Sequence, residues 1–102
     1  MAFDPNLNSA RIGYYRRIED DCPPDSIIHV MKLHVESAAP ISNEDIRRYL
    51  VENVGISQAD RHTDKANACE QAGLLESVPG QPTRRRATEK GRQFYKGHRL
   101  AT

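Results

Sequence analysis

Aromatic residues and cysteines are scarce in this sequence. The 102 residues include no tryptophan, six tyrosines and phenylalanines, and two cysteines. A chain of this length forms one domain, and the shortage of aromatic side chains gives it a thin core. No stretch approaches the roughly 18 apolar residues of a membrane span, and the start of the chain lacks the charged and apolar regions of a signal peptide. We therefore expect a cytoplasmic protein with no membrane partner.

The two cysteines are not expected to form a disulfide or to be reactive. Cys22 and Cys69 lie far apart in different kinds of segment, which argues against a disulfide framework and for reduced cysteines. Cys69 is expected to pack as a small apolar residue. A redox-sensing role for Cys69 is the alternative, but burial and the neighbouring Glu70 would raise its pKa and make it less reactive.

The histidines do not have the spacing of a metal site. His29 and His34 are five residues apart, about 140° around a helix, so they do not share a face. His62 is expected to be partly buried and hydrogen-bonded, and His98 lies in a basic tail. The chain has no nucleophile-and-base motif and no glycine-rich phosphate loop. We predict no enzymatic activity, no cofactor and no metal.

Charge is divided unevenly along the chain. Residues 1–57 carry six basic and nine acidic side chains, whereas residues 58–102 carry nine basic and five acidic ones. Three consecutive arginines, Arg84, Arg85 and Arg86, begin a stretch to Arg99 that has seven basic residues and one acidic residue. Such a basic end on a nearly neutral protein indicates one electrostatic docking face.

Apolar periodicity and capping residues predict five helices and one hairpin. The helices cover residues 9–21, 25–38, 42–55, 57–72 and 89–98, and their expected N-caps are Ser9, Asp25, Ser42, Ser57 and Thr88. Ser42 and Asp45 have the spacing of a capping box, and Gly55 can end that helix in a left-handed conformation. Residues 74–78 and 83–87 are expected to be strands joined by a Pro and Gly turn.

This order of elements, together with three short motifs, resembles the winged helix-turn-helix regulators. The motifs are AGLLE after the fourth helix, the Pro and Gly hairpin beside the arginines, and ATEKGRQFY after the hairpin. The resemblance extends to the MarR type and to small archaeal and phage repressors. It implies a mainly α fold with a small β-hairpin (α+β) over residues 25–96, preceded by an extension, 1–24, and followed by a tail, 97–102.

The resemblance implies double-stranded DNA as the partner, with the helix over 57–72 in the major groove. The hairpin over 76–87 would then lie on the phosphate backbone or in the minor groove. The expected contact residues are Ser57, Gln58, Arg61, Thr63, Asp64, Lys65, Asn67, Arg84, Arg85, Arg86, Lys90 and Arg92. Among these residues, Arg61, Asp64 and Asn67 are the first candidates for reading the DNA sequence through contacts with base edges. In an alternating strand Arg84 and Arg86 face one way and Arg85 the other.

Each of these features also has an ordinary interpretation. The arginines can form a solvated surface, and Asp60 and Asp64 can pair with Arg61 or Lys65 in a simple packing helix. We expect a sequence-specific transcriptional regulator or repressor that binds as a homodimer through residues 9–21 or the tail. The alternative is a winged-helix interaction module in a larger, possibly viral, complex, using its acidic half. No residue identifies a small-molecule effector.

Overall fold

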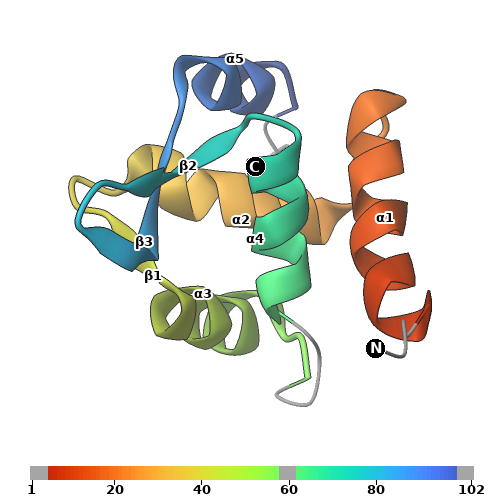
Figure 1. The fold of residues 1–102 in the computed structure, drawn as a ribbon, viewed down its shortest axis with the longest axis horizontal. Coiled ribbons are helices and arrows are strands. Elements are labelled where there is room, and N and C mark those ends of the chain that lie inside the picture. Colours follow the sequence, from red (N-terminus) through yellow and green to blue (C-terminus); the bar gives the residue numbers. More distant parts are fainter. Residues whose placement is uncertain (1–4, 58–61, 99–102) are drawn as a thin grey trace.

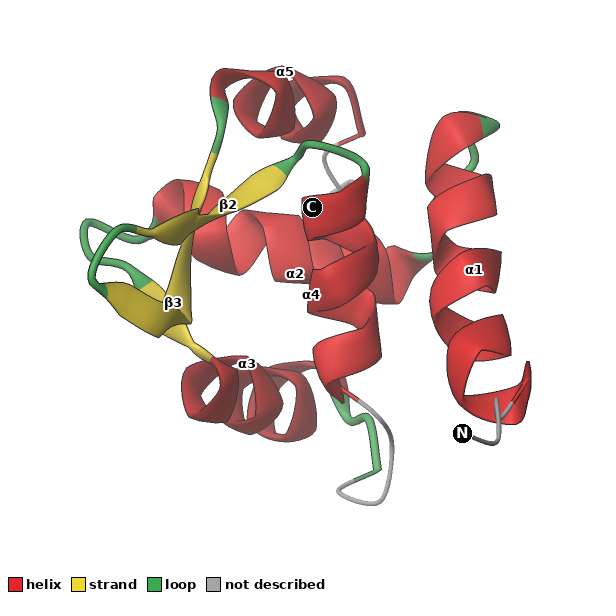
Figure 2. Cartoon of the chain, viewed as in Figure 1, coloured by secondary structure: helices red, strands yellow, loops and turns green. Residues whose placement is uncertain are grey.

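The structure is a computed structural model that describes residues 5–57 and 62–98, with side chains from Arg11 onward. These residues form an α+β fold of five α-helices and a small antiparallel sheet (Figures 1 and 2). The elements are α1 (Pro5–Glu19), α2 (Asp25–Glu36), β1 (Ile41–Ser42), α3 (Asn43–Tyr49), the π-helical segment η1 (Leu50–Val54), α4 (His62–Gln71), β2 (Leu75–Val78), β3 (Gln81–Ala87) and α5 (Glu89–His98). No helix in the described segments is long and apolar enough to cross a membrane.

The core forms around α2. Its Ile27, Val30 and Met31 are fully buried, because apolar residues recur at helical spacing along one face. Ile46 of α3 and Leu50 of η1 pack into the same cluster. Burial of side chains of this size stabilises the fold by about 1.5–3 kcal/mol each.

Two of the predicted helix starts, those of α3 and α5, agree with the structure, and those of α1 and α2 differ. Ser42 and Asp45 form the predicted capping box, in which the Ser42 hydroxyl accepts from the Asp45 amide at 3.1 Å. The Thr88 hydroxyl accepts from the Gly91 amide at 3.0 Å and caps α5, also as predicted. The prediction for α2 is wrong: Pro24 is the N-cap, and Asp25 is the first helical residue, where its charge suits the helix dipole.

The helix expected over 42–55 is not uniform. It is α-helical to Tyr49 and then widens into the π-helical turn of η1. Gly55 ends it with a φ of 79°, the left-handed conformation that the sequence predicted.

The sheet has the strand order β1-β3-β2. The predicted hairpin is present as β2 and β3, with Gly80 in its turn at a φ of 78°. β1 was not predicted, since two residues are too few to show alternation. It pairs Ile41 with Arg85 and Ser42 with Arg84, so that β3 is the central strand.

The N-terminal helix lies alongside α4, on the flank away from the sheet (Figure 1). It begins at Pro5 and not at Ser9. Ile18 is buried in the core and Tyr14 packs against it, four residues earlier on the same face. The N-terminal extension therefore belongs to the folded unit and covers part of the helix that was expected to read DNA.

Candidate nucleic-acid interface

The three arginines of β3 alternate as predicted. Arg84 and Arg86 are exposed, whereas Arg85 is only 9% exposed and points toward the helices. A strand places successive side chains on opposite faces, and β1 and β2 hold β3 in that register from both sides.

Arg85 fastens the hairpin to the helices. Its Nε donates to Glu70 Oε1 at 2.8 Å, its Nη1 to Asn43 Oδ1 at 2.5 Å and its Nη2 to Asn67 Oδ1 at 2.6 Å. The planar guanidinium has donors fixed in a fork, which is why one side chain can join α3, α4 and β3. The expectation that Arg85 contacts DNA is corrected, because its guanidinium is turned inward and its donors are engaged.

Arg84 and Arg86 remain at the surface. Arg86 Nε lies 2.6 Å from Glu76 Oε2 on the neighbouring strand, and both side chains are about half exposed. Arg84 Nη1 donates weakly, at 3.4 Å, to the carbonyl oxygen of Pro40. Exposed ion pairs contribute about 0–1 kcal/mol, so a phosphate can replace such a partner at little cost.

Two residues of α4 that were expected to contact DNA, Asp64 and Lys65, are buried. Asp64 is 9% exposed and Lys65 is 2% exposed. Ala68, which follows them on α4, is fully buried. Lys65 Nζ lies 5.1 Å from the centre of the Tyr14 ring, in a cation–π contact with α1. The prediction that this face is exposed is wrong, because α1 lies on it.

A narrower strip of α4 stays accessible. Thr63 and Gln71 are exposed and Asn67 is half-buried. Ser57 is exposed ahead of the helix, whereas Gln58 and Arg61 lie outside the described residues. Gln71 was not selected from the sequence, although its position four residues after Asn67 places it on the same face.

Lys90 and Arg92, which were expected to extend the DNA-contacting surface, make different contacts. Lys90 Nζ donates to the Ala72 carbonyl oxygen at 2.8 Å, so it satisfies the C-terminal end of α4. Arg92 is exposed and its Nη1 lies 3.8 Å from Glu89 on the same helix.

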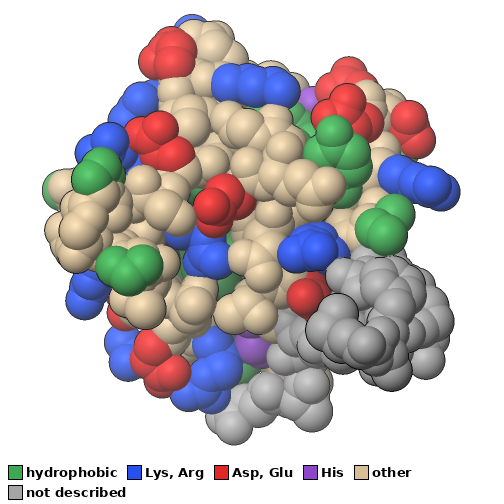
Figure 3. Space-filling view, in the orientation of Figure 1, with side chains coloured by type: hydrophobic (Ala, Val, Ile, Leu, Met, Phe, Trp, Pro, Cys, Tyr) green, Lys and Arg blue, Asp and Glu red, His purple; other side chains and the backbone are tan. Residues whose placement is uncertain are grey.

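A polar groove runs between α1 and α4. It has a volume of about 490 Å³ and is lined by Arg11, Asn67, Glu70 and Gln71. In the face shown in Figure 3, basic and acidic side chains are interspersed, and uncharged polar side chains and backbone fill much of the centre. Arg11 was missed because the sequence does not show which helix α1 packs against.

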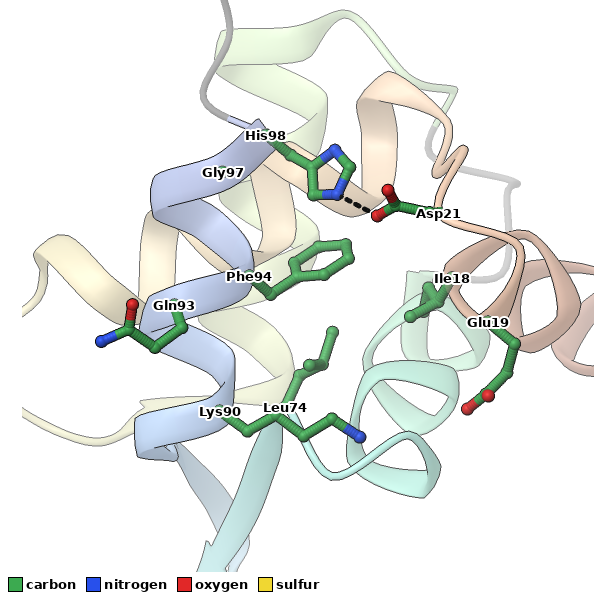
Figure 4. A pocket seen from close by; sticks show the side chains of 9 residues that line it. All are labelled: Ile18, Glu19, Asp21, Leu74, Lys90, Gln93, Phe94, Gly97 and His98. Carbon is green, nitrogen blue, oxygen red and sulfur yellow. Dashed lines mark hydrogen bonds and ion pairs between the residues drawn. The ribbon is translucent and has the colours of Figure 1, made fainter.

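A second groove, of about 550 Å³, lies between the end of α1 and α5 (Figure 4). Ile18, Leu74 and Phe94 supply its apolar floor. His98 and Asp21 close one end through a contact of 2.7 Å between Nε2 and Oδ1.

Two buried titratable groups have pKa values shifted by their surroundings. Burial raises the pKa of Cys69 to about 12, with the Arg85 charge acting weakly in the other direction. Burial also lowers the pKa of His34, whose Nδ1 donates to the Val30 carbonyl oxygen at 2.7 Å. His62 is buried, as expected. No cluster of three or more His, Cys, Asp or Glu residues with the geometry of a metal site occurs in the segments that the structure describes.

No family model, curated protein or solved structure matches the chain.

Proposed function

We propose that this chain is a sequence-specific, double-stranded DNA-binding protein of the winged helix-turn-helix type, acting as a transcriptional regulator. The order α2, β1, α3, α4, β2, β3 and the strand order β1-β3-β2 support it. The observation that carries the proposal is the hairpin: Arg84 and Arg86 face outward, and Arg85 between them ties the hairpin to α4. A rigidly placed pair of outward arginines beside a helix suits a groove edge with its phosphates.

In this proposal the hairpin and α4 have separate tasks. Arg84 and Arg86 contact phosphates, Arg86 exchanging its surface partner Glu76 for one of them. Thr63 and Asn67, on the accessible strip of α4, approach base edges. Asp64, Lys65 and Arg85 have no contact role, because each is buried, and Lys90 has none because its Nζ is engaged by the Ala72 carbonyl oxygen.

A protein-interaction module is the second candidate. It is favoured by the covering of α4 by α1 and by the pairing of Arg86 with Glu76, which together reduce the basic surface.

We also propose that the DNA-binding protein is a homodimer, because one helix reads too few base pairs for good discrimination. The outward face of α1, where Ile12 is 41% exposed, is the surface we assign to it.

Binding of a mixed-sequence duplex across a salt series tests the proposal. We expect wild type to bind at low salt, and a double variant, Arg84→Glu with Arg86→Glu, to lose affinity and about two units of the salt slope. The matched control is Arg17→Glu with Lys96→Glu, which makes the same change in net charge at two other exposed positions. Equal losses of affinity in both double variants would mean that only the net charge of the protein matters. The absence of binding by wild type at every salt concentration would refute the proposal.

A further inference from the structure

A third groove lies between α2 and the end of α3 with η1. It has a volume of about 490 Å³, within the range of about 300–1,000 Å³ that is typical of small-molecule sites. Its lining includes four residues from one face of α2 and two from α3 and η1, namely His29, Lys32, Leu33, Glu36, Tyr49 and Asn53. None of these residues is a proposed DNA contact, so a ligand site here does not depend on the DNA-binding proposal.

The groove presents one cation and one anion from the same face of α2. Lys32 is half-buried, and Glu36 is exposed four residues further on. In the part of the chain that the structure describes, Lys32 makes no hydrogen bond or ion pair. Glu36 accepts at Oε2 from the hydroxyl of Tyr95 at 3.1 Å, and this neutral donor leaves the carboxylate charge uncompensated. Neither charge is therefore paired with another side chain.

The two charges define the class of ligand. A simple carboxylate would be attracted by Lys32 and repelled by Glu36, and a simple amine would meet the reverse. A zwitterion satisfies both side chains at once. The two residues are about 6 Å apart along the helix axis, one turn of α2. Their flexible side chains can therefore converge on an ammonium group and a carboxylate that are attached to the same carbon atom.

The remaining wall of the groove is apolar and aromatic. Leu33 and Tyr49 are partly buried and pack against the hydrophobic core. The centre of the Tyr49 ring lies 6.3 Å from that of the His29 ring, and the two ring planes are tilted by 50°. An apolar or aromatic side chain of a ligand would remove this surface from water.

Asn53 adds an uncharged polar group on the side of η1. It is exposed, and its amide can donate to a carboxylate and accept from an ammonium group. Tyr49 is the residue at which η1 begins to widen, and Asn53 lies within the π-helical turn. Single π-helical turns occur frequently at functional sites.

We propose that the groove between α2 and η1 binds a free α-amino acid with an apolar or aromatic side chain. Lys32 binds the carboxylate of the amino acid and Glu36 binds its ammonium group, in charge-assisted hydrogen bonds. The side chain of the amino acid lies on Leu33 and Tyr49.

Titration of wild type with L-phenylalanine and L-leucine tests the proposal, with calorimetry and backbone amide shifts as readouts. N-acetyl-phenylalanine, which has no ammonium group, and phenylalaninamide, which has no carboxylate, are the ligand controls. We expect both controls to bind about tenfold more weakly than phenylalanine, because each loses one charge-assisted contact. No binding of either amino acid at about 10 mM, or equal binding of phenylalanine and its two derivatives, would overturn the inference.

Two variants assign the charges to the side chains. Lys32→Gln should weaken phenylalanine binding about tenfold and should not weaken phenylalaninamide binding, because this ligand has no carboxylate to lose. Glu36→Gln, which can still accept from Tyr95, should weaken phenylalanine binding and should not weaken binding of N-acetyl-phenylalanine.

The matched controls for these variants are Lys96→Gln and Glu52→Gln, at exposed positions outside the groove. Both should bind phenylalanine as wild type does. Equal losses in the controls, or losses that are the same for all three ligands, would overturn the inference. None of these experiments contains DNA, so their failure leaves the DNA-binding proposal standing.

Discussion

Arg85 is the residue that joins the sheet to the helices. Its three hydrogen bonds reach Glu70, Asn43 and Asn67, and its neighbours Arg84 and Arg86 reach none of these. A guanidinium at this depth is stable because its donors are matched, and its removal would leave a carboxylate and two amides facing a void.

We expect Arg85→Met to lower the free energy of unfolding by about 2–4 kcal/mol, since methionine keeps the stem and loses every donor. Arg84→Met, one residue away on the exposed face, should change it by less than about 0.5 kcal/mol. Urea denaturation measures both. Equal, small effects would mean that the Arg85 fork contributes no stability.

His34 makes stability depend on pH. Its folded pKa is lowered, first by burial and then by the Arg85 charge, while the hydrogen bond to Val30 acts against this. The unfolded chain therefore binds the proton more readily, and the stability that neutral His34 contributes is present above about pH 6.5 and is lost as the pH falls below it. Urea midpoints from pH 8 to pH 5 should fall more steeply for wild type than for His34→Gln. Parallel curves would exclude His34 as the cause.

At the scale of elements, α5 is held close to the loop before β2. A Cβ on Gly91 would overlap the Leu74 carbonyl oxygen and lie 2.8 Å from Met31 Cε, whereas a Cβ on Gly97 of the same helix would meet nothing within 4 Å. Gly91 is thus required by the packing of α5 against the chain after α4, and Gly97 is not.

Gly91→Ala is expected to lower the free energy of unfolding by about 1–3 kcal/mol or more, because the helix must move off the Leu74 backbone. Gly97→Ala should raise it by up to about 1 kcal/mol through helix propensity. Thermal melts of the two variants, which carry the same substitution, give the comparison. A stabilising Gly91→Ala would contradict the packing described.

Short-range sequence patterns predicted the helices and strands well, but they did not predict which of these elements pack against each other. The Ser42–Asp45 capping box, the Gly55 stop and the alternation of Arg84 to Arg86 depend on residues near one another in sequence, and the structure confirms them. The burial of Lys65 could not be predicted, because it depends on Tyr14, far away in the sequence, lying over it. The same tertiary contact brought Arg11 to the candidate site.

At the scale of the whole molecule, the net charge of +1 is too small to attract nucleic acid by itself. Binding must therefore come from a local surface, and the account assigns it to the β2–β3 hairpin and the accessible strip of α4. This placement has a direct experimental signature, since each segment contributes backbone amides that can be followed individually.

The most direct measurement is a titration of isotope-labelled protein with a duplex at low salt, recorded by the NMR chemical shifts of the backbone amides. The account predicts that the largest shifts occur in residues 76–87 and at Thr63, Asn67 and Gln71. Shifts confined to other surfaces, or no shifts at a duplex excess, would contradict the claim that this face binds DNA.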